Sequence, residues 1–192
     1  MHDCQPLAWF PEADSLAFVG RQFQGDPDVI FRLSVGTGEI RPLTFPPKDS
    51  GGDFLPAISL DGHHLAFTRL LSKWIPPPPR LYVVALTTAK TPAGEPQALT
   101  KPEQPGAGGS AWTSDGRRVV FSGARGLWSV GLDHRVPELL PLSGYSPLFP
   151  TISRNGSRLA FVKSSDDLDI WRVDGPRVRL REVLLPRLRR CD

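Results

Sequence analysis

Ile58-Ser-Leu-Asp-Gly-His-His-Leu-Ala-Phe67 is one of four ten-residue segments that align with one another without a gap. The other three copies lie at residues 9–18, 112–121 and 152–161. Each copy begins with Trp or Ile and ends with Leu-Ala-Phe or Val-Val-Phe. Four copies of one string indicate an internal repeat, and a repeat constrains the whole architecture before any single residue is considered.

Each copy is predicted to fold as a β-hairpin. Its first strand ends near the Trp or Ile, and its second strand carries the apolar run at the end of the segment. Three copies have Asp-Gly or Asn-Gly between the two strands, which suits a tight turn because these residues tolerate a positive φ. We assign a structural role to the turn residues Asp61, Gly62, Asp115, Gly116, Asn155 and Gly156. The first copy has Glu12-Ala13 instead, so its turn is the least regular of the four.

Two more apolar segments follow each hairpin before the next copy begins. The third segments lie at residues 29–33, 81–86, 127–130 and 170–173, and the weaker fourth segments at 40–44, 97–100, 138–142 and 178–180. Four short strands separated by turns describe one blade of a β-propeller. Equivalent residues recur at intervals of 49, 54 and 40 residues, close to the spacing of propeller blades. A β-sandwich also has many short strands, but it would not usually repeat one string in register.

The sequence therefore predicts an all-β fold, a β-propeller-type array of four four-stranded antiparallel blades. We expect a single domain over residues 1–180, followed by a basic C-terminal tail at 181–192. The blades are expected at about residues 6–45, 54–100, 110–142 and 148–180.

The repeat resembles that of TolB-type (WD-repeat-like) propellers, whose core is similar to Pro-x-(Trp/Phe/Ile)-Ser-Pro-Asp-Gly-x-x-Leu-Ala-Phe. Segments 56–62 and 150–156 carry the match, and segment 110–116 has Ser in place of the leading Pro. The resemblance implies a ring of six or seven blades, whereas this chain has four. The sequence does not distinguish among three arrangements. They are a small closed ring, an open arc or fragment of a longer ring, and half of a ring that two chains complete. An open arc would leave bare strand edges, through which a homodimer could form.

The repeats, the missing catalytic constellation and the loop that carries Trp74 favour a non-enzymatic scaffold or binding module that contacts a protein or peptide partner through its inter-strand loops. The alternative is a sensory or accessory domain derived from a larger winged-helix regulator or a prolyl-oligopeptidase-type serine peptidase. The family resemblance also implies a periplasmic or extracytoplasmic location. Residues 1–20 contain no signal-peptide pattern, which leaves both the cytoplasm and an export segment on a longer parent chain open.

The sequence contains no recognisable catalytic, cofactor or metal-binding motif. Ser129 lacks the preceding Gly of a nucleophile elbow, and His63 and His64 occupy the variable hairpin positions. No glycine-rich phosphate loop precedes a helix. We therefore expect no enzyme activity, no cofactor and no metal.

The net charge of +3 comes from the C-terminal end of the sequence, which includes the last part of blade 4 and the tail. Residues 175–192 sum to +4, so residues 1–174 sum to −1, and we expect no nucleic-acid surface on the blades. No apolar stretch is long enough to span a membrane. Cys4 and Cys191 are the only cysteines, and whether they pair stays open.

Residues 70–79, Leu-Leu-Ser-Lys-Trp-Ile-Pro-Pro-Pro-Pro, form an insert in the second blade. Consecutive prolines favour an extended polyproline II rod. An aromatic residue on a loop is a common anchor for a partner, so we expect Lys73, Trp74 and Ile75 to bind the partner. The alternative is that Trp74 folds back over the blade. Blade connections 48–53 and 101–109 are expected to share this face with the insert.

Overall fold

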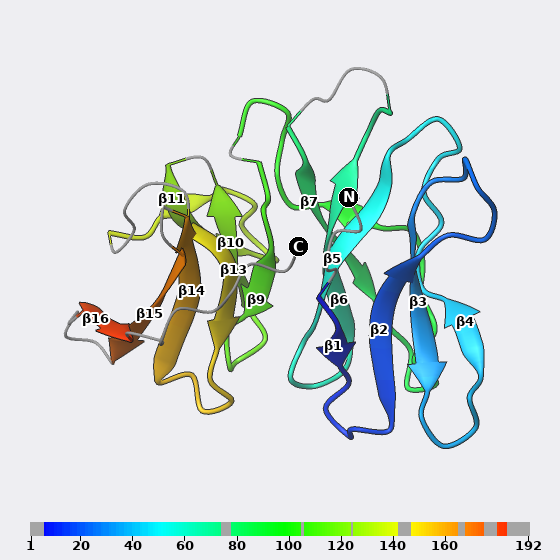
Figure 1. The fold of residues 1–192 in the computed structure, drawn as a ribbon, viewed down its shortest axis with the longest axis horizontal. Helices are drawn as coiled ribbons and strands as arrows, with labels where there is room; N and C mark the ends of the chain where they lie inside the picture. Colours follow the sequence, from blue (N-terminus) through cyan, green and yellow to red (C-terminus); the bar gives the residue numbers. More distant parts are fainter. Residues whose placement is uncertain are drawn as a thin grey trace.

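The computed structural model describes residues 6–73, 78–104, 106–123, 125–141, 147–164, 168–174 and 180–183, with side chains described as far as Lys163. These residues form sixteen strands in four four-stranded antiparallel sheets, and no helix occurs among them (Figure 1). The predicted all-β array of four blades is confirmed. Trp74, Ile75, Cys4 and Cys191 lie outside the described residues, so the expectations placed on them stay predictions.

Each blade takes its four strands in order from one continuous stretch of chain. Blade 1 contains β1 (Ala8–Trp9), β2 (Ser15–Gly20), β3 (Val29–Ser34) and β4 (Ile40–Pro42). Blade 2 contains β5 (Gly52–Ile58), β6 (His64–Leu70), β7 (Arg80–Ala85) and β8 (Gln97–Ala98). Blade 3 contains β9 (Ser110–Trp112), β10 (Arg118–Gly123), β11 (Gly126–Gly131) and β12 (Glu138–Leu139). Blade 4 contains β13 (Pro147–Ile152), β14 (Arg158–Ser164), β15 (Leu168–Asp174) and β16 (Leu180–Val183).

The repeated segments form the hairpins between the first and second strands of the blades. In blade 2 the Ser59 hydroxyl donates to Asp61 Oδ1 at 2.5 Å, and the same oxygen accepts the backbone N–H of His63 at 2.9 Å. Thr113 with Asp115, and Ser153 with Asn155, repeat this arrangement in blades 3 and 4. The turn glycines Gly62, Gly116 and Gly156 have φ of +72°, +67° and +70°. The first copy uses the same backbone conformation without glycine, since Ala13 has a φ of +58°.

Successive hairpin turns also touch one another along the array. A Cβ built on Gly116 would lie 3.7 Å from Asp61 Oδ2 of the preceding blade. A Cβ built on Gly156 would lie only 2.2 Å from the Ser114 hydroxyl. The glycines therefore serve both the local turn and the close approach of neighbouring blades.

Three buried apolar clusters hold the blades together, and each joins one pair of successive blades. Between blades 1 and 2 the cluster includes Ala17 and Ile30 on one side and Leu65 and Phe67 on the other. Equivalent clusters join blade 2 to blade 3 and blade 3 to blade 4. No such cluster joins blade 1 to blade 4 among the described residues. As far as the described residues go, the four blades therefore form an array that does not close on itself.

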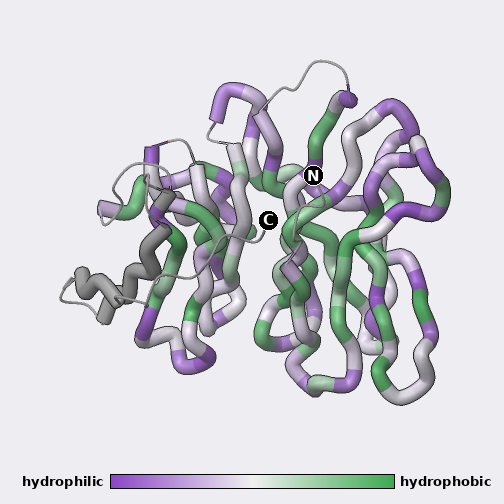
Figure 2. The backbone as a smooth tube through the Cα atoms, viewed as in Figure 1, coloured by the Kyte–Doolittle hydropathy of each residue, from purple (hydrophilic) through white to green (hydrophobic). Residues whose placement is uncertain are grey.

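The open array places blade 1 and blade 4 at opposite ends of the molecule (Figure 1). The strands are largely apolar, and hydrophilic residues gather in the loops at their two ends (Figure 2). A fully buried Leu or Phe contributes about 1.5–3 kcal/mol to folding, so the interfaces between blades supply much of the stability.

Candidate functional site: a pocket on the loop face

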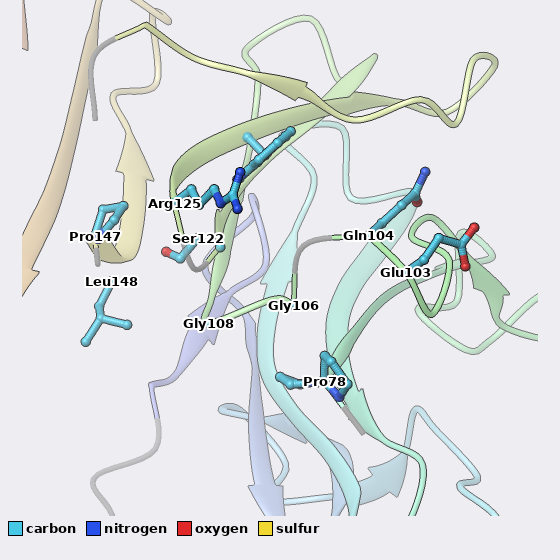
Figure 3. A pocket seen from close by; sticks show the side chains of 12 residues that line it. Pro78, Glu103, Gln104, Gly106, Gly108, Ser122, Arg125, Pro147 and Leu148 are labelled. Carbon is cyan, nitrogen blue, oxygen red and sulfur yellow. The ribbon is translucent and has the colours of Figure 1, made fainter. Parts of the chain in front are cut away.

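The larger of two concavities that we consider lies where the blade 2 insert meets blades 3 and 4. Its volume is about 740 Å³. Its walls come from the insert, from the connection between blades 2 and 3, from the β10–β11 hairpin and from the start of β13 (Figure 3). The lining residues that matter below are Pro78, Pro79, Glu103, Ser122, Arg125, Trp128 and Leu148. We call this cavity the loop-face pocket.

Backbone hydrogen bonds fix the floor of the loop-face pocket. The Ala107 N–H donates to the Pro79 carbonyl at 3.0 Å, which ties the blade connection to the insert. The Gly108 N–H donates to the Ser122 carbonyl at 3.0 Å, which extends the pairing of blade 3 beyond β9. A Cβ on Gly108 would lie 3.3 Å from Leu148 Cδ2, so the absent side chain lets blade 4 approach the floor closely.

Two buried polar atoms in the walls have no hydrogen-bond partner among the residues that the structure describes. Ser122 is 1% exposed and its hydroxyl is unpaired, and the indole N–H of Trp128 is also unpaired. A buried donor without a partner costs about 1–3 kcal/mol. Such a cost is removed when a ligand supplies the missing partner.

The two unpaired atoms lie on different sides of blade 3. Phe121 pairs with Trp128 across β10 and β11, and Ser122 is the next residue along β10. Because successive side chains alternate between the faces of a sheet, Ser122 and Trp128 project from opposite faces. Arg125 stands at the hairpin between them (Figure 3). A ligand that reaches both atoms must therefore extend over this end of the blade.

The charged groups around the pocket are available to a ligand. Arg125 and Glu103 are both exposed, and neither makes an ion pair with any residue that the structure describes. Figure 3 places Glu103 and Gln104 on one side of the opening and Pro147 and Leu148 on the other. The pocket thus combines an apolar floor with one positively and one negatively charged side chain at its rim.

The second concavity is the channel between the innermost strands of the blades, with a volume of about 330 Å³. Leu55 and Phe149 occupy equivalent positions there with φ of +55° and +49°, and Gly109 has a φ of +113° at the matching place in blade 3. A positive φ is strained for Leu and Phe. The lining residues are apolar apart from Ser110 and Thr151, and none carries a charge. Among the described residues of this lining there is no Asp, Glu, His, Cys, Lys or Arg.

Of the three residues predicted to bind a partner, Lys73 alone belongs to the described part of the chain, and it does not line the loop-face pocket. The Lys73 ammonium donates to the Gly25 carbonyl of blade 1 at 2.6 Å, so it holds a neighbouring loop. The turn residues Asp61, Asp115 and Asn155 belong to hairpins that join the other ends of the strands.

Sequence reasoning missed Ser122 and Trp128. Both belong to strands whose alternation identifies them only as core residues. Their lack of partners becomes apparent only when the blades are packed together. The blade connection at 101–109, in contrast, was expected on this face and does line the pocket.

No group of three or more His, Cys, Asp or Glu side chains that could hold a metal ion occurs in the part of the chain described. Within the same residues, no helix is long and apolar enough to cross a membrane.

No protein-family model and no curated protein matches this sequence. Solved structures do match the fold. TolB from Acinetobacter baumannii superposes with a TM-score of 0.72 at 20% identity, over 93% of this chain and 43% of that one. A TolB protein from Agrobacterium tumefaciens gives 0.69 at 21% identity, over 95% of this chain and 62% of that one. A puromycin-hydrolyzing peptidase from Mycobacterium tuberculosis gives 0.66 at 18% identity, over 96% of this chain and 30% of that one.

This chain therefore spans less than two thirds of the length of each of these proteins. At such low identity the likeness establishes the fold and not the activity. The repeated hairpins, the four blades and the structural matches agree, and the chain has the β-propeller fold of TolB-type proteins.

Proposed function

We propose that this protein is a non-enzymatic propeller scaffold that binds an extended peptide segment of a partner protein in the loop-face pocket. The observation that carries this proposal is the pair of unpaired buried groups, Ser122 Oγ and Trp128 Nε1, on opposite faces of one blade. An extended peptide presents carbonyl and N–H groups at regular spacing, so one segment laid over this end of the blade can offer a partner to each atom when the two side chains turn toward it.

The remaining features of the pocket favour the same ligand. Pro78 and Pro79 provide a rigid apolar wall whose backbone needs no further ordering. Arg125 and Glu103 offer opposite charges at the rim, which would orient a peptide through its own charged side chains. Pockets that are mostly apolar with a few convergent polar groups are the usual form of a binding site.

Peptide selection on the purified protein tests this proposal. Random peptides would be displayed and selected on the protein, and the affinity of the selected peptides measured by calorimetry. Trp128→Phe keeps an aromatic side chain at this position but removes the indole N–H, and we expect it to weaken binding about five- to tenfold, the effect of one hydrogen bond. Trp112→Phe is the matched control, because the Trp112 indole N–H already donates to the Ala57 carbonyl at 3.0 Å. Equal affinity in all three proteins would place the peptide elsewhere.

The alternative function is that of an accessory propeller for a peptidase or a regulator. The observation in its favour is the structural likeness to peptidases, including puromycin hydrolase and prolyl endopeptidases. A gene for a hydrolase or winged-helix domain directly beside the gene for this chain, and co-purification of the two products, would support it. Trp128→Phe would not abolish such an association if the contact is made through another face.

A further inference from the structure

Blade 1 presents an apolar sheet face that no other part of the described structure covers. Trp9, Leu16, Leu33 and Ile40 lie opposite one another across all four strands, and Phe18 and Phe31 stack beside them with ring centroids 5.7 Å apart. Trp9 and Ile40 are each 56% exposed. We call these six residues the open face of blade 1.

The repeat identifies what kind of surface this is. The residues of blade 2 equivalent to Leu16 and Phe18 are Leu65 and Phe67, which are fully buried against blade 1. In blade 3 the equivalents are Val119 and Phe121, which are fully buried against blade 2. In blades 2, 3 and 4, therefore, this face packs on the preceding blade.

The opposite face of each blade has a different composition and forms the other half of the interface. Blade 1 offers Ala17 and Ile30, blade 2 offers Ala66, Leu81 and Val83, and blade 3 offers Val120 and Leu127. These side chains are small or branched, and the large aromatic side chains of the next blade pack between them. The faces are complementary and not alike.

Blade 4 carries a face of this second kind on its outer side. Leu159 and Phe161 pack toward blade 3. Because side chains alternate along β14, Ala160 and Val162 point away from blade 3. Among the described residues, no apolar cluster covers this outer face, and Ala160 and Val162 are small or branched like the side chains that receive the next blade elsewhere in the array.

We infer that the open face of blade 1 binds the outer face of blade 4 of a second copy of this chain. The same contact made twice around a two-fold axis gives a closed dimer with two identical interfaces. Two copies joined in this way hold eight blades, which lies within the range of four to eight that propeller rings adopt. Closure would remove the exposed Trp9 and Ile40 of blade 1 from water.

The first test is the mass of the protein in solution as its concentration is raised from micromolar to millimolar. We expect light scattering to give twice the mass of one chain. Ile40→Glu places a charge on the open face, and we expect it to raise the dimer dissociation constant by about 100-fold or more, because the carboxylate would be buried without a partner. Val136→Glu is the matched control, since Val136 is an exposed apolar residue of the β11–β12 loop outside both faces.

A mixing experiment tests which faces meet. Val162→Glu should also give a monomer, because it alters the outer face of blade 4. A mixture of the Ile40→Glu and Val162→Glu proteins retains one intact face of each kind, so it should regain the mass of a dimer. An interface formed by two copies of the open face would not recover in this way. Circular dichroism and thermal melting show whether each variant is folded.

Three results would overturn the inference. A wild-type protein that stays monomeric at every concentration would assign the open face to a blade of a different polypeptide. A dimer that is unaffected by Ile40→Glu would place the interface elsewhere. Two folded monomeric variants that fail to recover on mixing would rule out the pairing of blade 1 with blade 4.

Discussion

Arg69 and Asp53 form a buried bidentate ion pair between β6 and β5, with Nε 2.6 Å from Oδ1 and Nη2 2.8 Å from Oδ2. Asp53 is completely buried, and the Arg69 guanidinium also lies over the rings of Phe67 and Tyr82. The two residues are partners across the antiparallel pair that opens blade 2. Each charge therefore depends on the other.

Removing one member of this pair should be strongly destabilising. Arg69→Met leaves the Asp53 carboxylate buried without its partner, and we expect a loss of about 3–5 kcal/mol in the free energy of unfolding. Urea denaturation measures this value. Arg21→Met is the control, because Arg21 pairs with Asp28 at the surface and exposed pairs contribute about 0–1 kcal/mol. Similar losses in the two variants would contradict the assignment.

A single substitution in the turn of the first hairpin should raise the stability of the protein. Ala13 has a positive φ, whereas the other three turns have Gly at the equivalent position. Ala13→Gly should stabilise the protein by about 0.5–1 kcal/mol, because the left-handed conformation is strained for an L-residue with a side chain. Gly62→Ala makes the reverse change in blade 2 and should destabilise by a similar amount. Thermal melting of both variants would show shifts of opposite sign.

Gly52 should tolerate no side chain. Its φ is +109°, and a Cβ at this position would lie 2.3 Å from the backbone nitrogen of Asp28. The two residues form a parallel β-bridge between blades 1 and 2, so neither backbone can easily move aside. Gly52→Ala should cost well over 3 kcal/mol or prevent folding, since backbone strain and overpacking add together.

Gly25 is the matched control for that change. Its φ of +96° is also positive, but a Cβ there would meet nothing within 4 Å. Gly25→Ala should lower the free energy of unfolding by about 1 kcal/mol, the cost of a positive φ for a residue with a side chain. If the two variants yield equal amounts of folded protein, the close contact at Gly52 is not the cause.

The hairpin turns should make stability depend on pH in the acid range. The Thr113 hydroxyl and then the Arg117 backbone N–H donate to Asp115, and these hydrogen bonds lower the pKa of its carboxyl group. A carboxyl group whose pKa is lowered by folding adds stability above its unfolded pKa, and this stability is lost as the pH falls through the folded pKa. Asp115→Asn should therefore reduce the loss of stability on acidification below pH 4.

Asn155 shows that an amide can serve in this turn, because it accepts the same hydrogen bonds in blade 4. Asp115→Asn is thus expected to fold normally at neutral pH. Urea midpoints measured at several pH values would reveal the change. Identical pH dependence in the wild type and the variant would mean that Asp115 does not contribute.

The fold was largely predictable from the sequence, because the signals that specify it are local. The Asp-Gly and Asn-Gly pairs mark the turns, and the apolar runs mark the strands at a repeating interval. The loop-face pocket was predictable only as a region. Ser122 and Trp128 carry no local signal, since their unpaired atoms arise from the way in which separate blades meet.

The complementary faces were also hidden in the sequence. Leu-Ala-Phe describes a strand that is apolar on both sides, as blades in a stack require. It does not reveal that Leu16 and Phe18 lack the neighbour that their equivalents Leu65 and Phe67 possess. That difference follows from the number of blades and their order in space.

The continuous construction of each blade has a consequence for how the chain reaches its native state. Each sheet is built from four strands that are consecutive in the sequence, so that β1 to β4 form the first blade and β5 to β8 the second. Contacts between strands are therefore local in sequence, which favours rapid folding. The blades can form one after another as the chain leaves the ribosome, each serving as the template on which the next one packs.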